Sequence, residues 1–157
     1  MSIEPRAPQP LERRMTGGCQ CGRVRYSVEV HDDGAYLCHC RMCQRATGGV
    51  SIAFKNVKKA DVSWEHEPDR YASSPIARRG FCSACGTPLT FEFPDSANMD
   101  LTVGSFDDPA PFVPTHHFGV ESWHEAWLDT KGLAPYRTDD NPNVVDRWMK
   151  AVGKLPD

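Results

Sequence analysis

Seven cysteines in three close-spaced groups constrain this chain more than any other feature of its sequence. The groups are Cys19 and Cys21; Cys38, Cys40 and Cys43; Cys82 and Cys85. Seven is an odd number, so disulfides alone leave one thiol over. Three separate groups are also hard to explain as cysteines that merely pack in a core. We therefore predict that the fold brings these side chains together to bind metal.

The two outer pairs predict one closed metal site. An extended segment presents the sulfurs of Cys19 and Cys21 on one face, and Cys82-Ser83-Ala84-Cys85-Gly86 has the pattern of a zinc knuckle. Four thiolates complete a tetrahedron around zinc, which leaves no position for a substrate and makes the site structural. The alternative is that these residues are buried, unpaired cysteines, because cysteine is a good small core residue.

The central triple predicts a second zinc site with one position open. Residues two apart on a strand share a face, as do residues three apart on a helix, so a strand that runs into a helical turn would gather Cys38, Cys40 and Cys43. Zinc with three protein ligands and one exchangeable ligand is the catalytic pattern. Thiolate ligands make the metal soft, so a small-molecule thiol is a suitable fourth ligand.

Other side chains near the triple allow further interpretations. The second zinc could instead be structural, with His116 or His117 as its fourth ligand; only one of the two could reach it from a strand, and His39 would point away. Arg41 and Arg45 flank the triple. They could bind the carboxylates of an anionic substrate, or they could only offset the negative charge of clustered thiolates.

The remaining sequence predicts a mainly β fold. Val24, Tyr26, Val28 and Val30 alternate with polar residues, and short alternating segments recur up to Val103 and again over 115–121. Asp33-Gly34 is a hairpin signal after the first of these strands. A short C-terminal helix is expected to begin at Pro142, with Asn141 as its N-cap, and to stop at Gly153.

Composition and charge predict the domain organisation, the cellular location and the class of partner. Prolines in residues 1–14 predict a flexible N-terminal arm, followed by a single domain over residues 15–157. There is no apolar run of membrane-spanning length and no secretory signal at the start, which predicts a cytoplasmic protein without a membrane partner. The net charge of −3 argues against a nucleic-acid partner, and we interpret Arg78-Arg79 as solvated surface.

The motifs together resemble the glutathione-dependent formaldehyde-activating enzyme family, whose domain is shared with centromere protein V. The resemblance spans roughly residues 13 to 137. It rests on Gly18-Cys19-Gln20-Cys21-Gly22, Cys38-His39-Cys40-Arg41-Met42-Cys43 with Thr47-Gly48-Gly49, and Phe81-Cys82-Ser83-Ala84-Cys85-Gly86-Thr87. Thr115-His116-His117 and Leu133-Ala134-Pro135-Tyr136 also look like the family's C-terminal segment.

The resemblance implies a β-tent fold of packed antiparallel sheets with two zinc ions per chain. It implies a structural zinc on Cys19, Cys21, Cys82 and Cys85, and a second zinc on Cys38, Cys40 and Cys43. The implied activity is that of a carbon–sulfur lyase, which adds the thiol of glutathione to formaldehyde and catalyses the reverse. Arg41 and Arg45 are then candidates for binding the glutathione carboxylates.

Two other functions are compatible with the cysteines. The chain could be a non-catalytic zinc-binding module that interacts with a macromolecular partner, as the centromere relative suggests. It could also be a redox dithiol protein that uses Cys82 and Cys85. Metal analysis separates these hypotheses, because disulfides without zinc would exclude both zinc hypotheses.

Overall fold

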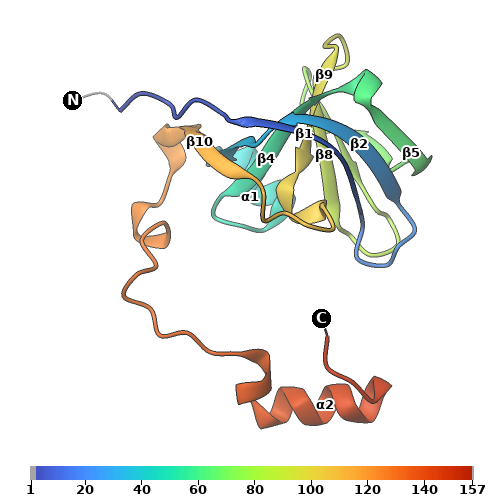
Figure 1. Ribbon diagram of the computed structural model, residues 1–157, viewed down its shortest axis with the longest axis vertical. Helices are drawn as coiled ribbons and strands as arrows, with labels where there is room; N and C mark the ends of the chain where they lie inside the picture. Colours follow the sequence, from blue (N-terminus) through green and yellow to red (C-terminus); the bar gives the residue numbers. More distant parts are fainter. Residues whose placement is uncertain (1–2, 157) are drawn as a thin grey trace. The chain divides into compact units, whose positions relative to one another are not determined.

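The computed structural model describes residues 3–156, and the chain separates into two compact units (Figure 1). The first unit runs to His124 and contains every strand in the described part of the chain. The second unit begins at Glu125 and consists of two 3₁₀ turns and a helix: η4 (Glu125–Trp127), η5 (Thr138–Asp140) and α2 (Pro142–Val152). No helix in residues 3–156 is both long and apolar enough to cross a membrane.

The first unit is built from two sheets. The smaller sheet has the order β1-β2-β5 and is antiparallel throughout, with β1 (Pro10–Gly18), β2 (Arg25–Asp32) and β5 (Val62–His66). The larger sheet has the order β10-β3-β4-β9-β8-β7-β6. Its strands are β3 (Gly34–Cys38), β4 (Ile52–Lys58), β6 (Asp69–Ala72), β7 (Arg78–Phe81), β8 (Pro88–Glu92), β9 (Asn98–Thr102) and β10 (Val113–Phe118).

The mainly β fold class and the short C-terminal helix are thus confirmed. The larger sheet departs from a purely antiparallel arrangement at one edge, where β10 pairs with β3 in parallel. One short helix, α1 (Arg41–Thr47), connects β3 to β4, and the remaining turns of the first unit are η1 (Lys59–Asp61), η2 (Val103–Ser105) and η3 (Val120–Ser122).

The main hydrophobic core takes side chains from both sheets. Tyr26, Val28 and Val30 from β2 are at most 2% exposed, as their alternation predicts, and they belong to one cluster with Val57, Met99 and Leu101 of the larger sheet. Tyr26 packs edge-on against Phe106 with ring centroids 5.6 Å apart, and its hydroxyl bonds to Ser105 at 2.8 Å. Burial of these apolar faces is what holds the two sheets together.

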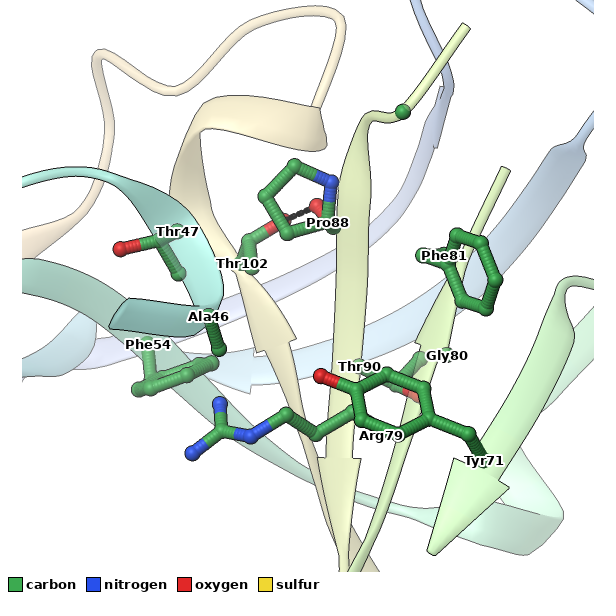
Figure 2. A pocket seen from close by; sticks show the side chains of 11 residues that line it. Ala46, Thr47, Phe54, Tyr71, Arg79, Gly80, Phe81, Pro88, Thr90 and Thr102 are labelled. Carbon is green, nitrogen blue, oxygen red and sulfur yellow. Dashed lines mark hydrogen bonds between the residues drawn. The ribbon is translucent and has the colours of Figure 1, made fainter. Parts of the chain in front are cut away.

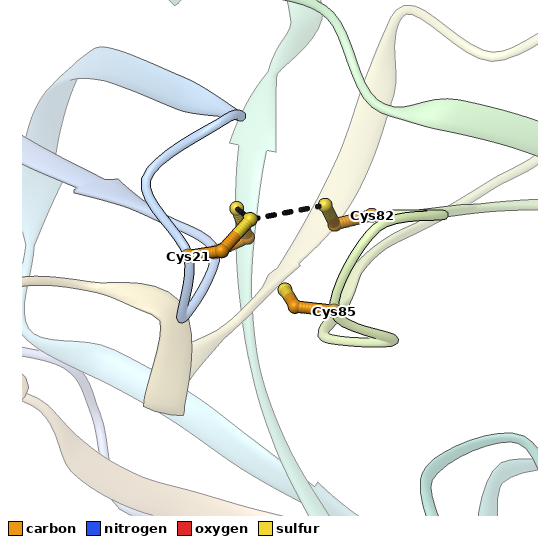
Figure 3. Close-up of side chains that lie close together, drawn as sticks. Cys21, Cys82 and Cys85 are labelled. Atoms are coloured by element: carbon orange, nitrogen blue, oxygen red, sulfur yellow. Dashed lines mark hydrogen bonds between the residues drawn. The ribbon is translucent and has the colours of Figure 1, made fainter. Parts of the chain in front are cut away.

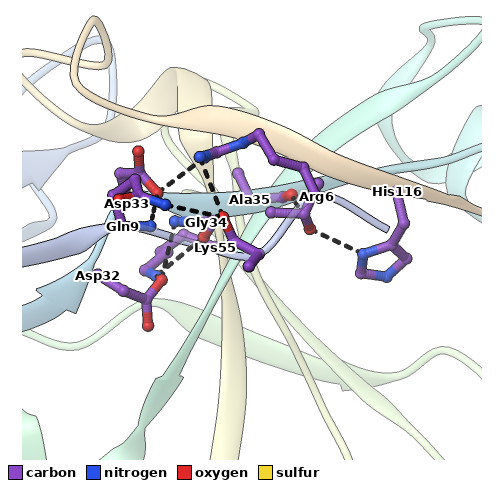
Figure 4. A network of polar contacts seen from close by, with 10 residues as sticks. Arg6, Gln9, Asp32, Asp33, Gly34, Ala35, Lys55 and His116 are labelled. Atoms are coloured by element: carbon purple, nitrogen blue, oxygen red, sulfur yellow. Dashed lines mark hydrogen bonds and ion pairs between the residues drawn. The ribbon is translucent and has the colours of Figure 1, made fainter. Parts of the chain in front are cut away.

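The predicted hairpin at Asp33-Gly34 is wrong. β2 and β3 flank it but belong to different sheets, so the chain crosses between sheets there. Buried Lys55 holds the crossing by donating to the Asp32 carboxylate at 2.6 Å and to the Gly34 carbonyl at 2.8 Å (Figure 4). Asp32 therefore pairs with a buried lysine, and its carboxylate also accepts from the Gly34 N–H at 2.8 Å, so the chain turns here without forming a hairpin.

The N-terminal arm is shorter than predicted. Residues 10–14 form the first part of β1, and Arg6 pairs with the Asp33 carboxylate at 2.8 Å (Figure 4). The backbone N–H of Gln9 also donates to that carboxylate, at 2.7 Å. Prolines at positions 5, 8 and 10 suggested a loose segment, but they precede or begin the strand, where a missing N–H is tolerated. That residues 15–157 act as one domain stays a prediction.

In the second unit, α2 begins and ends where the sequence predicts. The Asn141 side chain accepts hydrogen bonds from the N–H groups of Asn143 and Val144, Pro142 occupies the first turn, and Gly153 ends the helix with φ 74°. These are the standard cap interactions that satisfy the free backbone groups of helix ends.

We expect Leu101→Ala to destabilise the first unit strongly, because Leu101 is fully buried in the shared core. Substitutions of this kind cost about 2–5 kcal/mol of the free energy of unfolding. Urea unfolding of the metal-loaded protein measures the effect. Ile76→Ala is the matched control, since Ile76 is 67% exposed; equal losses for the two variants would contradict the core assignment.

A second prediction concerns pH. His31 on β2 bonds Glu12 of β1 at 2.7 Å and Asp61 of η1 at 3.2 Å, and these carboxylates, Glu12 first, raise its pKa above 6.5. The ion pairs therefore stabilise the fold fully below pH 6.5 and lose their effect as the pH rises through the folded-state pKa. His31→Gln should lower the urea midpoint at pH 6 more than at pH 9; equal losses at the two pH values would contradict the role of these ion pairs.

Candidate metal centres and the adjoining pocket

The four outer cysteines meet in one cluster (Figure 3). Their sulfur atoms all lie within 4.8 Å of one another; Cys21 Sγ is 3.5 Å from that of Cys19 and 3.7 Å from that of Cys82. Cys19 follows the end of β1 and Cys82 follows the end of β7, so the cluster joins the two sheets. Gly22 and Gly86 turn the chain just after each pair, with φ 81° and 79°.

This cluster has the donor set and the dimensions of a tetrahedral thiolate site. Bonds of about 2.3 Å between zinc and sulfur place tetrahedral sulfurs about 3.8 Å apart, close to the two spacings above. Cys82 is fully buried while Cys21 and Cys85 are exposed. Hydrogen bonds from the hydroxyl and N–H of Thr87 lower the pKa of Cys85 to about 5, which favours the thiolate form that binds metal.

An arginine and an aspartate form hydrogen bonds with the Cys82–Cys85 segment. Arg23 donates to the Asp69 carboxylate at 2.7 Å, and its guanidinium also lies 3.8 Å from Cys82 Sγ. The same carboxylate accepts from the N–H of Ser83 at 3.0 Å. Arg23 therefore brings positive charge to the cluster but is already paired with a carboxylate.

The central three cysteines form a second cluster, with sulfurs that also lie within 4.8 Å of one another. Cys38 ends β3, Cys40 is the N-cap of α1 and Cys43 lies in its first turn, where its N–H donates to Cys40 Sγ at 3.3 Å. The predicted strand-to-helix arrangement is confirmed. Cys38 and Cys43 are buried and Cys40 is half-buried, so the sulfurs converge under the start of the helix.

A later segment of the chain fixes the start of α1. The Gln44 side chain donates to the carbonyl of His39 at 2.6 Å and to that of Ser122 at 3.0 Å. Gly119 adopts φ 70°, and a Cβ there would lie 2.9 Å from the N atom of Cys40. This position therefore requires glycine for two reasons, its backbone conformation and its closeness to a candidate ligand.

Sequence reasoning missed Arg79, a charged residue in direct contact with the second cluster. Its guanidinium is 3.2 Å from Cys43 Sγ and lies over the ring of Phe91 at 4.9 Å. It is only 5% exposed, so the interpretation of Arg79 as solvated surface is wrong, while Arg78 is exposed and pairs with Glu92 at 3.1 Å. The alternation of β7 carries the signal: Arg78 and Arg79 point to opposite faces of the sheet.

Hydrogen bonds change the acidity of the second cluster. Bonds from Cys38 and then from Arg79 lower the pKa of Cys43 to about 5. The pKa of Cys38 moves in the opposite direction, chiefly because it is the donor to Cys43 and is buried. One thiolate is thus favoured before any metal binds, and it is the one beside the guanidinium.

A pocket of ≈ 250 Å³ adjoins this cluster (Figure 2). Ala46 and Thr47 of α1 line one side, Phe54 and Thr102 come from the middle of the larger sheet, and Tyr71 stands at the opposite side. Figure 2 shows the Arg79 side chain extending across the sheet toward Ala46 and Phe54. None of the three cysteines lines the pocket, but Arg79 links the two, because its guanidinium contacts Cys43 Sγ and its side chain is part of the lining.

The histidines considered as a fourth ligand do not join the three-cysteine cluster. Within residues 3–156, the possible metal-ligand group at the second cluster contains its three cysteines and no histidine. His39 is fully buried, and its Nε2 lies 2.9 Å from Nδ1 of His117; His116 stacks on the Tyr36 ring instead. As predicted for a strand, the two adjacent histidines contact different partners, and neither is a ligand candidate here.

Arg41 and Arg45 are both exposed on α1. Arg41 donates to the side-chain oxygen of Gln44. Neither arginine lines the pocket, which α1 borders with Ala46 and Thr47.

The sequence is similar to that of a known protein family and of a yeast protein. The family described as glutathione-dependent formaldehyde-activating enzyme matches residues 14–122. A protein of Schizosaccharomyces pombe (strain 972 / ATCC 24843), named an uncharacterized lyase, is 32% identical over 82 residues, which are 52% of this chain and 60% of that protein. The match thus spans 60% of that relative's length.

Among solved structures, a crystal structure of a Rhodobacter sphaeroides protein is similar with a TM-score of 0.53 and 21% identity. The similarity covers 66% of this chain and 99% of that one. At this identity the likeness concerns the fold alone.

The two clusters should differ in how far the fold depends on them. The outer cluster joins two sheets, so Cys85→Ser should release metal and unfold the first unit, since metal binding at such sites supplies folding free energy of about 10 kcal/mol or more. Cys43→Ser should lower metal content yet leave a folded protein. Metal analysis with near-ultraviolet circular dichroism measures both; equal unfolding by the two variants would contradict the distinction.

Proposed function

Because this chain belongs to the glutathione-dependent formaldehyde-activating enzyme family, we propose that it is a zinc-dependent carbon–sulfur lyase that adds glutathione to a small aldehyde and catalyses the reverse. The family and the relative named a lyase support a lyase-type function. We assign a structural zinc to Cys19, Cys21, Cys82 and Cys85 and a second zinc to Cys38, Cys40 and Cys43. The donor sets and sulfur spacings support this assignment.

One observation carries the proposal: the second cluster offers three sulfurs beside a pocket, whereas the outer cluster offers four. Three thiolates leave one coordination position of a tetrahedral ion for a substrate. A zinc ion bound there would supply one kind of chemistry, which is to hold a substrate thiol in its deprotonated, nucleophilic form at neutral pH.

The charge of this donor set favours a thiol over water as the ligand. Three thiolates on a divalent ion leave a net charge of −1, which weakens the ion as a Lewis acid and disfavours hydrolysis. A soft, easily deprotonated thiol suits such a site better. Arg79 returns the local charge to zero, because its guanidinium contacts Cys43 Sγ and forms no ion pair with a carboxylate in the described part of the chain.

The protein's own residues would order the reactants. Phe54 and Phe91 pack around the sulfurs and limit access of water from the sheet side. We propose that Arg41 and Arg45 bind the glutathione carboxylates, because both are exposed on α1, the helix that carries Cys43 and borders the pocket with Ala46 and Thr47. Holding thiol and aldehyde side by side lowers the entropic part of the barrier.

The proposal predicts that small thiols bind at the second cluster. In cobalt-substituted protein, glutathione should increase sulfur-to-cobalt charge-transfer absorption and release about one proton per chain, because only the thiolate binds the metal. Absorbance titration with pH-stat measurement follows both quantities. Cys43→Ser should abolish the response.

S-methylglutathione is the matched ligand control, since it keeps the carboxylates but has no thiol to deprotonate. A cobalt spectrum that no small thiol alters would contradict the enzyme assignment. A non-catalytic zinc-binding module would then be the better explanation of the two clusters.

A further inference from the structure

The pocket beside Cys43 is much larger than formaldehyde. A water molecule takes about 30 Å³ of liquid volume, so an aldehyde with two heavy atoms would fill only about a quarter of the pocket's ≈ 250 Å³. For comparison, a cavity of about 150 Å³ is known to accept benzene in another protein. The free volume therefore suits a carbonyl compound that carries a substituent of ring size.

The lining of the pocket favours an apolar substituent. Phe54, Tyr71 and Phe81 contribute aromatic rings, and Tyr71 packs edge-on against Phe81 at 5.6 Å. Three threonines line the pocket: Thr47 donates to the Cys43 carbonyl at 2.8 Å and Thr102 to the Pro88 carbonyl at 2.9 Å, while the buried Thr90 Oγ1 has no hydrogen-bond partner among the described residues. Aromatic walls bind apolar groups, and the few polar groups beside them, here Arg79 and the Thr90 hydroxyl, can fix the orientation of a ligand.

Arg79 is the charged donor at the inner side of this pocket (Figure 2). It contacts Cys43 Sγ through Nη2, and a guanidinium has further N–H groups. The net charge of the site indicates which substrates these N–H groups can bind. Three thiolates, a divalent ion and Arg79 sum to zero, and a bound substrate thiolate makes the site −1. An aldehyde with its own carboxylate would add a second negative charge in a buried place, which is unfavourable.

From these observations we propose that the second substrate is a neutral aldehyde with an aromatic or similarly bulky apolar group, whose carbonyl oxygen accepts a hydrogen bond from Arg79. This inference rests on the proposed thiol-addition function and names its aldehyde class. Aldehyde and thiol would meet where Arg79 borders the pocket, beside its contact with Cys43.

The chemistry balances without any further reactant. The thiol loses its proton to solvent, and the sulfur forms a bond to the carbonyl carbon. The π electron pair of the carbonyl moves to oxygen, where the Arg79 guanidinium stabilises the negative charge until water supplies a proton. The product is a hemithioacetal, nothing is oxidised or reduced, and the reverse reaction follows the same steps.

Binding of unreactive amides to the zinc-loaded protein tests the pocket without any catalysis. Benzamide presents a ring beside a neutral carbonyl, acetamide lacks the ring, and benzoate replaces the amide with a charge. Isothermal titration calorimetry should give benzamide an affinity about tenfold or more above that of acetamide, because the ring is buried. Benzoate should bind no more tightly than benzamide. Equal affinity for the two amides, or tighter binding of benzoate, would overturn the inference.

A pair of variants tests whether Arg79 binds the carbonyl group. Arg79→Met should weaken benzamide about tenfold or more, since a hydrogen bond from a charged donor is lost. Arg78→Met is the matched control and should bind benzamide as the unaltered protein does, because that neighbour pairs with Glu92 on the other face of the sheet. Equal benzamide affinity in the two variants would overturn the role of Arg79.

Ala46→Leu fills the pocket from α1 and leaves Arg79 in place, so it tests the size argument even if Arg79→Met does not fold. The ratio of the rate constants for benzaldehyde and formaldehyde, each with glutathione, should fall about tenfold. An unchanged ratio would overturn the inference. Thiol binding to the cobalt protein needs no aldehyde. If thiols bind but the amide measurements fail, only the aldehyde class is wrong. If no thiol binds, the proposed function itself is wrong, whatever the amides do.

Discussion

The fold of the first unit depends on the convergence of four sulfur atoms from two segments far apart in the sequence. Cys19 lies at the end of β1 in the smaller sheet and Cys82 at the end of β7 in the larger one. The main core already packs the two sheets face to face. The sulfur cluster adds a constraint of another kind, because it fixes where two strand ends lie to within a few ångströms. Hydrophobic burial is roughly proportional to area and has no such directionality.

Each cluster has one arginine near its sulfurs, and the comparison between the two explains the different chemistry we assign. Arg23 is paired with Asp69, and its guanidinium lies 3.8 Å from the nearest sulfur. Arg79 is buried, lies 3.2 Å from Cys43 Sγ and borders a pocket. A buried cation needs a nearby negative charge, and the thiolates provide it. At the outer cluster the arginine supports a closed structure, whereas at the second cluster it faces the space that a substrate would enter.

Much of this arrangement could be predicted from the sequence because the signals were local. Cysteine spacing predicts both clusters, alternation predicts the buried face of β2, and Asn141, Pro142 and Gly153 predict the ends of α2. The wrong predictions concern long-range partners. Asp33-Gly34 resembles a hairpin until Lys55 is known to lie beside Asp32, and Arg79 resembles surface until Cys43 is known to lie opposite. Neither partner is near in sequence: strand alternation separates Arg79 from Arg78 but cannot identify Cys43, and no local pattern places Lys55 beside Asp32.

The contact between Gly119 and Cys40 has a consequence for how the protein is made. The four-sulfur cluster has all its ligands once Cys85 has been synthesised, before β8, β9 and β10 exist. The three-sulfur cluster has its ligands much earlier, yet the segment that seats its helix, Gly119 to Ser122, emerges last of the first unit. During synthesis, the ligand set of the four-sulfur cluster is therefore complete before the segment that seats the helix of the three-sulfur cluster has been made. The site with fewer sulfurs is the one whose surroundings are assembled later.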